Sequence, residues 1–230
     1  MQLLAVDTAT SILSVAICDQ DSLIAEATLE CDRRHTERLL ATIDWILSES
    51  SLRLSDIDVL AVSVGPGSFT GLRVGLAAMK GLAIGAHLPL VGVPTLDAMA
   101  RTPGISDGIV CPVLDAKMGE VFAAAYESRR DSLTRCAPER VCSIQDFLSE
   151  TAEMATYFGD GALLYRAEIE RLRPESTVLG TLFRNPRASA VALEAFKLLQ
   201  LGVATDPNAV IPVYLRVSQA EQARAKASTP

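Results

Sequence analysis

The fold of this chain is decided by the stretch Gly65-Pro66-Gly67-Ser68-Phe69-Thr70-Gly71-Leu72-Arg73-Val74-Gly75, which follows an apolar, β-branched run at residues 59–64. A nearly uncharged segment continues from it to residue 85. This order predicts a strand, a glycine-rich turn and the start of a helix. Two uses of such a turn stay open. The free N–H groups of a first helical turn can hold an anion, and glycines let two chain segments approach closely because they lack a Cβ.

Two common nucleotide motifs do not fit this turn. A P-loop carries a Lys directly after its second glycine, whereas the first Lys of this chain is Lys80. The dinucleotide fingerprint needs a glycine at its sixth position, where Thr70 stands. The sequence therefore excludes P-loop and Rossmann sites, and it leaves a packed structural turn or an anion site of another kind.

The same stretch closely resembles the signature of the TsaB family, which comprises accessory subunits of the bacterial machinery that makes threonylcarbamoyladenosine in tRNA. The signature loop is Gly65, Pro66, Gly67, Ser68, Phe69 and Thr70. Five further segments stand in the family's order: Asp7-Thr8-Ala9-Thr10, His35-Thr36-Glu37-Arg38-Leu39, Val113-Leu114-Asp115-Ala116, Gly159-Asp160-Gly161-Ala162 and Pro212-Val213-Tyr214-Leu215-Arg216. The resemblance covers nearly the whole chain, and its central block is the most specific part.

Composition is that of an ordinary folded protein. The chain has 230 residues, of which 49% are apolar and 21% are charged. No apolar stretch is long enough to span a bilayer, and no basic stretch precedes the first apolar run. The five cysteines form no C-x-x-C pair, which favours reduced thiols. We therefore expect a cytoplasmic protein without a membrane partner.

The net charge is −7, whereas a protein that binds a polyanion by itself normally shows a basic face. Any contact with tRNA is therefore expected to be indirect, through a partner.

Hydrophobic patterning predicts the same order of elements twice. The first half contains strands at 3–6, 12–18 and 23–29, a helix at 34–50, a strand at 59–64, a helix at 70–85, a strand at 90–93 and a helix after residue 95. The second half contains strands at 109–114, 120–126 and 140–142, a helix at 144–148, a strand at 155–158 and helices at 161–172 and 189–201. Each half thus has three strands followed by alternating helices and strands.

A duplicated plan of this kind is typical of the actin, sugar-kinase and Hsp70 superfamily, and the resemblance to TsaB implies the same architecture. We predict an α/β, two-lobed actin/sugar-kinase/Hsp70-like (ASKHA) fold of duplicated βββαβαβα units. The N-terminal lobe spans residues 1–105 and holds the partner-binding helices, and the C-terminal lobe spans 106–230. Two placements stay open for the helix at 189–201, which can pack on its own lobe or on the first.

The superfamily resemblance also implies a nucleotide site at the end of each first strand. There an Asp and the turn after it meet phosphate and Mg²⁺, and Gly usually follows the Asp. Here Thr8-Ala9 follows Asp7 and Ala116-Lys117 follows Asp115, and an Ala Cβ crowds a close phosphate approach. Asp7 either bonds turn amides or contacts a weakly bound nucleotide. The candidates for residual nucleotide contact are Asp7, Thr8, Thr10 and Asp115, and no dedicated cofactor is expected.

Residues for catalysis are missing from the pattern. The related TsaD subunit carries two metal-binding His four residues apart on a helix, whereas Leu39 stands four residues after His35. The other His, His87, is distant in sequence, and a mononuclear site needs about three protein ligands. A Gly-x-Ser-x-Gly nucleophile elbow is also absent. We therefore predict no catalytic residue and no metal: the chain is a pseudoenzyme.

Two helices are candidates for binding a partner. The apolar stripe of the helix at 34–50 is Leu39, Leu40, Ile43, Ile46 and Leu47. Trp45 falls on the opposite face, where it either anchors a partner or is covered by the chain's own loops. The helix at 70–85 is apolar or small nearly all round, so it must be covered on more than one side. The predicted interface residues are Arg38, Ala41, Trp45, Gly71, Arg73, Gly75 and Lys80.

The resemblance implies a non-catalytic subunit that is required for threonylcarbamoyl transfer to adenosine 37 of ANN-decoding tRNAs, where it scaffolds and activates TsaD. The implied partners are TsaD, the TsaE ATPase and, when TsaD is absent, a second copy of the chain. Two alternatives stay open: an ATP-binding enzyme of the same superfamily, either an ATPase or a small phosphotransferase, and a self-associating protein with a separate role.

Overall fold

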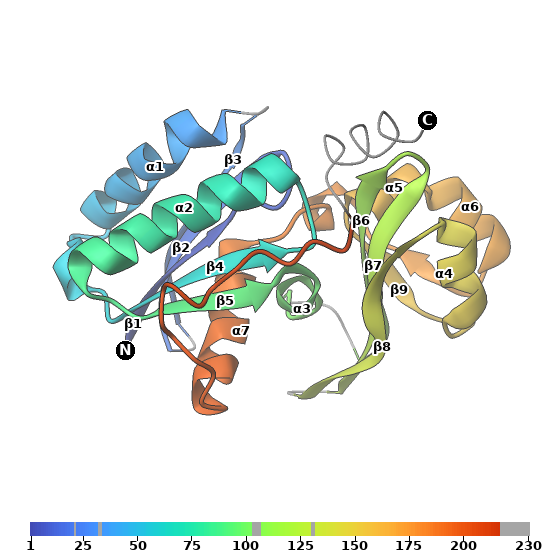
Figure 1. The fold of residues 1–230 in the computed structure, drawn as a ribbon. Helices are drawn as coiled ribbons and strands as arrows, with labels where there is room; N and C mark the ends of the chain where they lie inside the picture. Colours follow the sequence, from blue (N-terminus) through green and yellow to red (C-terminus); the bar gives the residue numbers. More distant parts are fainter. Residues whose placement is uncertain (21, 32–33, 103–106, 130–131, 217–230) are drawn as a thin grey trace, which may run out of the picture.

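The computed structural model describes residues 1–20, 22–31, 34–102, 107–129 and 132–216. It contains two five-stranded sheets, with strand orders β3-β2-β1-β4-β5 and β10-β9-β6-β7-β8 (Figure 1). In each sheet three antiparallel strands are extended by two parallel ones. The predicted order of three strands followed by alternating helices and strands, repeated once, is confirmed.

The first lobe is a sheet covered on both faces. Its strands are β1 (Gln2–Asp7), β2 (Ile12–Asp19), β3 (Ser22–Glu30), β4 (Val59–Gly65) and β5 (Leu90–Pro94). Helices α1 (His35–Glu49) and α2 (Phe69–Ala86) lie side by side on one face, and a short 3-10 helix (Leu54–Asp56) follows α1 (Figure 1). On the other face lie α3 (Thr95–Ala100) and α7 (Ala188–Gln200).

Alternation along β1 shows why the sheet is buried on both sides. Leu4 and Val6 pack in the core under α1 and α2, whereas Leu3 and Ala5 pack against α7. A strand buried on both faces reads as a continuous apolar run, which explains the patterns at residues 3–6 and 59–64.

The second lobe repeats the plan. Its strands are β6 (Gly108–Lys117), β7 (Glu120–Arg129), β8 (Ser132–Cys142), β9 (Thr156–Phe158) and β10 (Thr177–Val178). Its helices are α4 (Ile144–Glu150), α5 (Asp160–Leu164), α6 (Arg166–Leu172) and a 3-10 helix at Thr181–Phe183. The prediction of a single helix at 161–172 is wrong, because the helical conformation is interrupted at Tyr165, which has φ −103° and ψ 18°.

Helix α7 follows the second lobe in sequence but packs on the first-lobe sheet. Ala188, Val191 and Ala195 lie against the β1 face, in one cluster with Leu3 and Ala5. The predicted lobe boundary near residue 105 falls at 103–106, outside the described residues.

Side chains of the first sheet hold the start of α7. The backbone N–H and hydroxyl of Ser189 donate to Glu26 Oε1 at 2.9 and 2.8 Å, and the N–H of Ala188 donates to Ser14 Oγ at 2.9 Å. Arg187 pairs with the other carboxylate oxygen of Glu26. A carboxylate at a helix N-terminus satisfies free N–H groups and opposes the helix dipole, so Glu26 fixes α7 to the first lobe.

We expect Glu26→Ala to lower the free energy of unfolding by about 2 kcal/mol, because it leaves the first-turn donors of α7 without their acceptor. Chemical denaturation measures the change. The matched control is Glu30→Ala, which removes an exposed ion pair with Arg184 and is expected to change stability by less than about 0.5 kcal/mol. Equal losses in the two variants would contradict the capping role.

Candidate functional site

The signature loop joins β4 to α2 and lies on the turn that follows β1. The N–H of Ser68 donates to Ala9 O at 2.7 Å. The Ser68 hydroxyl caps α2 by accepting from the N–H of Gly71 at 3.3 Å. Of the two uses left open for this turn, the close approach of two chain segments is present in the structure.

The predicted place of Gly71 and Gly75 in a partner interface is wrong. Both glycines are buried against the chain's own Thr8. A Cβ on Gly71 would lie 2.1 Å from Thr8 O, and a Cβ on Gly75 would lie 2.2 Å from Thr8 Oγ1. Thr8 Oγ1 also donates to Gly71 O at 2.8 Å. These two glycines therefore let α2 pack closely against Thr8 at the end of β1, and they do not face a partner.

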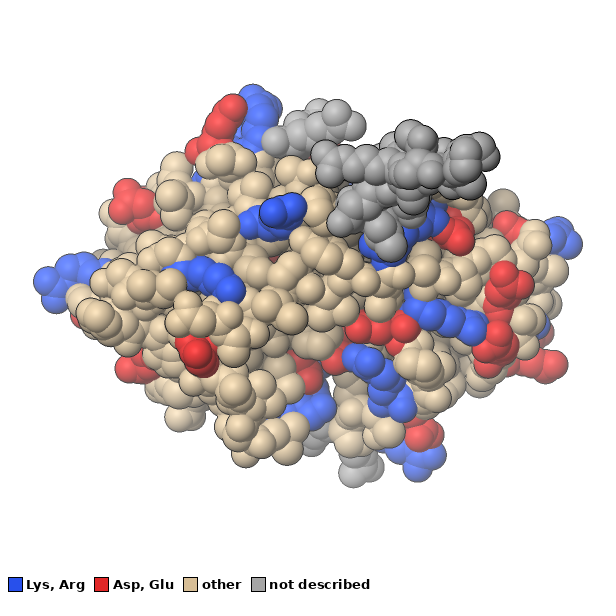
Figure 2. Space-filling view, viewed as in Figure 1, with Lys and Arg blue, Asp and Glu red and all other residues tan. Residues whose placement is uncertain are grey.

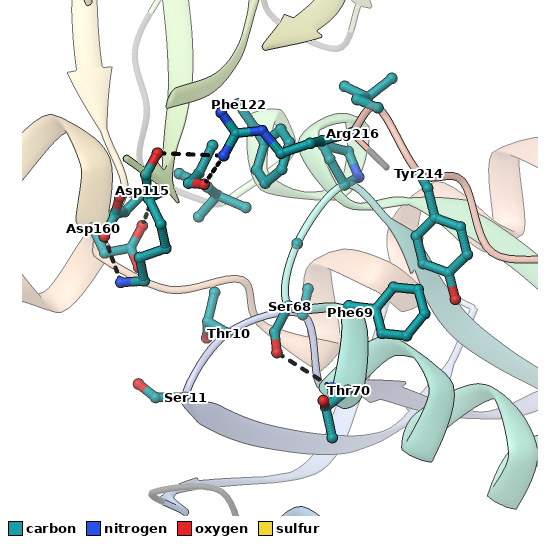
Figure 3. Close-up of a pocket in the computed structure, with 18 of the residues that line it drawn as sticks. Thr10, Ser11, Ser68, Phe69, Thr70, Asp115, Phe122, Asp160, Tyr214 and Arg216 are labelled. Atoms are coloured by element: carbon teal, nitrogen blue, oxygen red, sulfur yellow. Dashed lines mark hydrogen bonds and ion pairs between the residues drawn. The ribbon is translucent and has the colours of Figure 1, made fainter. Parts of the chain in front are cut away.

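A cleft of about 750 Å³ lies between the lobes (Figure 3). Thr10, Ser11 and the signature loop line its first-lobe wall, and Asp115 and Asp160 line the second-lobe wall. The structure thus brings Thr10 and Asp115, two of the four candidates for nucleotide contact, together with the signature loop. Asp7 and Thr8 do not line the cleft but lie beneath it.

Asp7 is a buried carboxyl group with 1% of its surface exposed. Its Oδ1 accepts from the N–H of Ala9 at 3.0 Å, so the predicted bond to a turn amide is present. Burial raises the pKa of Asp7 to about 6, against the opposing effects of the Ser63 hydroxyl and the Ala9 amide. An ionised Asp7 at neutral pH is therefore unfavourable for folding.

The second-lobe wall is paired internally. Lys117 donates to both carboxylate oxygens of Asp115, through its N–H at 2.8 Å and through Nζ at 2.5 Å. The N–H of Asp115 donates to Asp160 Oδ1 at 2.9 Å. Burial, together with the nearby charge of Asp115, raises the pKa of Asp160. Lys117 thus holds the carboxylate that the superfamily resemblance assigns to a bound nucleotide.

Neither histidine stands in a metal-ligand cluster within the described ranges. His35 is buried, with Nε2 3.4 Å from Ile12 O, and His87 ends α2 in a left-handed conformation with φ 56°. Among the described residues, no group of three or more His, Cys, Asp and Glu side chains could hold a metal ion.

The outer sides of α1 and α2 expose large apolar side chains. Trp45 is 55% exposed, Leu40 53% and Ile84 54%. Placing Leu40 in the buried stripe was a wrong prediction, because it borders a groove of about 620 Å³ between the two helices, with Phe69 and Ala77. Figure 2 shows a largely uncharged surface here, broken by isolated basic groups. The open alternative that the chain's own loops cover Trp45 is therefore wrong.

The exposed side of α2 has the spacing of a helix-packing seam. Thr70, Val74, Ala77, Gly81 and Ile84 follow one another at alternating intervals of four and three residues, and all are exposed or half-buried. Such spacing averages 3.5 residues, the repeat by which one helix packs along another. No heavy atom lies within 4 Å of a Cβ added to Gly81 or Gly85, so the seam is open. We call this set of five residues the α2 seam.

Of the remaining predicted interface residues, Arg38 and Ala41 lie on α1, and Arg73 and Lys80 lie on α2. Ala41 and Arg73 are exposed, and Arg38 and Lys80 are half-buried. Arg73 lies over the ring of Phe69, 5.1 Å from its centroid. The predicted list of interface residues leaves out Leu40, Gly81 and Ile84, although the four-three spacing along α2 could have added the last two.

No helix in the described ranges has both the length and the apolar character needed to cross a bilayer.

The family model "TsaD: tRNA N6-adenosine threonylcarbamoyltransferase" matches residues 27–223. The tRNA threonylcarbamoyladenosine biosynthesis protein TsaB of Bacillus subtilis is 28% identical over 96% of both chains, and the TsaB protein of Escherichia coli is 45% identical over 55% of both. A Pseudomonas aeruginosa crystal structure, described as an uncharacterized protein with similarity to peptidase YeaZ, superposes with a TM-score of 0.78 at 26% identity. It covers 94% of this chain and 99% of that one. The predicted two-lobed ASKHA-like fold is confirmed.

Proposed function

The chain belongs to the TsaB family and takes part in tRNA threonylcarbamoyladenosine biosynthesis, and from this premise we propose that it is a non-catalytic subunit which docks on a TsaD-type catalytic subunit. In this role it is required for threonylcarbamoyl transfer to adenosine 37 of ANN-decoding tRNAs, because it holds the catalytic subunit in its competent shape. The proposal places the chain in the cytoplasm, together with the catalytic subunit and the tRNA.

The observation that carries the proposal is the open α2 seam with exposed Leu40 across the groove from it, together with exposed Trp45 elsewhere on α1. Helices whose apolar sides face water mark protein-binding surfaces, and Trp is a favoured anchor. The small residues of the seam let a second helix approach closely, and the groove between α1 and α2 can take a side chain from it. These features support a helical partner, which is TsaD or, in its absence, a second copy of the chain.

The state of the cleft supports an accessory role over catalysis. Lys117 holds Asp115, the turn after Asp7 reads Thr8-Ala9 without the Gly that is usual in the superfamily, and the described residues contain no metal-ligand cluster. Several arginines of the second lobe are paired with acidic groups, as in Arg140–Glu150 and Arg166–Glu170. Together with the net charge of −7, this pairing supports indirect contact with tRNA. The TsaE ATPase is proposed to bind the docked pair and to return it to its starting state after each round of the reaction.

A reconstituted reaction tests the proposed function. It contains TsaD, TsaE, the adenylate-forming enzyme and an ANN-decoding tRNA, with or without this chain, and mass spectrometry measures threonylcarbamoyl on adenosine 37. We expect product only when the chain is present, and none from the chain with adenylate and tRNA alone. Equal product without the chain would overturn the proposal, and product from the chain alone would make it an enzyme.

The interlobe cleft favours one second candidate, an ATP-binding enzyme of the same superfamily. Its hydroxyl-bearing wall, with Thr10, Ser11 and Ser68 near the start of α2, can receive a phosphate. Calorimetric titration of the isolated chain with ATP and Mg²⁺ separates the two candidates. Saturable binding that Thr10→Val abolishes, together with ATP turnover, would favour the enzyme. The accessory role predicts at most weak binding and no turnover.

A further inference from the structure

The segment after α7 returns along the first lobe and reaches the second (red in Figure 1). Its start is fixed to the first lobe by three contacts. Leu90 N–H donates to Thr205 O at 2.9 Å, Lys80 Nζ donates to Asn208 O at 3.4 Å, and Val210 is buried in the core under α1 and α2. This path places the motif Pro212-Val213-Tyr214-Leu215-Arg216 beside the mouth of the cleft.

The motif is anchored first at the end of β4. Val213 N–H donates to Val64 O at 2.7 Å. A Cβ on Gly65 would lie 2.4 Å from Val213 O, so the glycine at this position is what lets the segment lie so close. The ring of Tyr214 then packs on Phe69 with centroids 4.7 Å apart, as Figure 3 shows.

The same motif is anchored next in the second lobe. Arg216 Nη1 donates to Ala116 O at 2.9 Å, and its guanidinium group pairs with the carboxylate of Glu120. Both partners belong to the β6–β7 hairpin. Leu215 packs between these anchors against a core cluster that includes Leu114 and Phe122.

The length of the motif limits how far the lobes can separate. Residues 213 and 216 are three apart, so even a fully extended chain spans roughly 10 Å between them. The ends of β4 and of the hairpin therefore cannot move apart by more than the slack in this tether unless an anchor breaks. Farther along the β6–β7 pair, α3 joins the lobes: its Asp97 accepts from the Tyr126 hydroxyl at 2.7 Å, and Arg101, which follows α3, pairs with Glu194 of α7. An α3 packed against both lobes can serve as a pivot.

We propose that residues 213–216 form an interlobe latch, which fixes the width of the cleft and whose release at Arg216 lets the lobes open. Two-lobed proteins change shape by rotating lobes about a hinge, and here the hinge side is α3 and the latched side is the cleft mouth. The latch gives the C-terminal motif a role that docking through α1 and α2 does not explain. It holds whether or not the chain acts as an accessory subunit.

Distance measurement between spin labels tests the latch. Labels on Ser48→Cys in α1 and Ser149→Cys in α4 report the separation of the lobes, in a chain whose exposed Cys136 is replaced by Ser. The labelled chain with an unmodified latch is expected to give a single narrow distribution of label–label distances. Arg216→Ala is expected to add a population at longer distance, and Arg129→Ala, which removes an exposed pair with Glu127 on β7, is expected to add none. An Arg216→Ala distribution that matches the Arg129→Ala control would overturn the proposal.

A second variant keeps every anchor, in case Arg216→Ala disturbs folding. Inserting two glycines between Tyr214 and Leu215 lengthens the tether by roughly 7 Å. The expected result is a broader distribution that extends to longer distances, with an unchanged circular dichroism spectrum. A distribution as narrow as that of the unmodified chain would mean that the tether does not set the width of the cleft, and the latch would be wrong.

Discussion

Gly81→Glu is expected to stabilise the isolated chain by roughly 0.5–1 kcal/mol and, at the same time, to weaken docking of a helical partner about 100-fold. The gain follows from replacing a glycine inside α2 by a good helix former, at a position where an added Cβ meets no atom within 4 Å. The loss follows because a charged side chain in the α2 seam blocks close packing, which costs about 3 kcal/mol in a buried contact. Chemical denaturation measures the first effect, and calorimetric titration with TsaD measures the second.

Gly180→Glu is the matched control for that experiment. Gly180 lies in the second lobe, also has open space around it and has φ −74°, which any residue can adopt. The control is expected to bind TsaD as the unmodified chain does. If Gly81→Glu also binds normally, the α2 seam is not a docking surface. Gly75→Arg would not be a clean test, because its side chain would strike Thr8 inside the same chain.

Asp7→Asn is expected to raise the free energy of unfolding by about 3 kcal/mol at pH 8. Burial raises the pKa of Asp7 from 3.8 to about 6 in the folded chain, and each unit of pKa corresponds to about 1.4 kcal/mol. The folded state binds the proton more tightly than the unfolded state does, so the neutral carboxyl favours folding below pH 3.8. That contribution is lost as the pH rises from 3.8 to 6. Asn stays neutral and keeps an acceptor for Ala9 N–H.

Denaturation of Asp7→Asn and of the unmodified chain between pH 4 and 8 measures this difference. The gap in stability is expected to be small at pH 4, to grow up to pH 6 and to stay constant above it. The exposed Asp44→Asn on α1 serves as control and is expected to differ from the unmodified chain by less than about 0.5 kcal/mol. A destabilised Asp7→Asn at pH 8 would contradict the account. A stabilised one would show that the charge is kept for a reason other than folding.

Local pattern was sufficient to predict most elements, because strands buried on both faces and strongly periodic helices leave clear signals. The runs that became β1, β4 and α2 differ from the structure by at most one residue at each end. The break at Tyr165 has no such signal, since neither Gly nor Pro interrupts the apolar pattern there. The hydrophobic period also cannot separate a residue at the margin of a buried stripe from one inside it, which is why Leu40 was misplaced.

The site was harder to predict, because spacing along a helix does not say what lies across from it. Gly71 and Gly75 share one side of α2 with the sheet, and Gly81 and Gly85 lie on the open side. The members of each pair are four residues apart, and only the contact of the first pair with Thr8 distinguishes the two pairs. Likewise, the contact of Arg216 with the β6–β7 hairpin joins positions 100 residues apart, so the C-terminal motif could be noted from the sequence but not placed.

The central claim, that this chain acts by docking through the α2 seam on a catalytic subunit, is tested most directly by the yield of threonylcarbamoyladenosine in the reconstituted reaction with Gly81→Glu in place of the unmodified chain. The account predicts product with the unmodified chain and with Gly180→Glu. With Gly81→Glu at the same concentration, it predicts a yield close to that of a reaction without the chain. A normal yield with Gly81→Glu, from a variant shown to be folded, would contradict it.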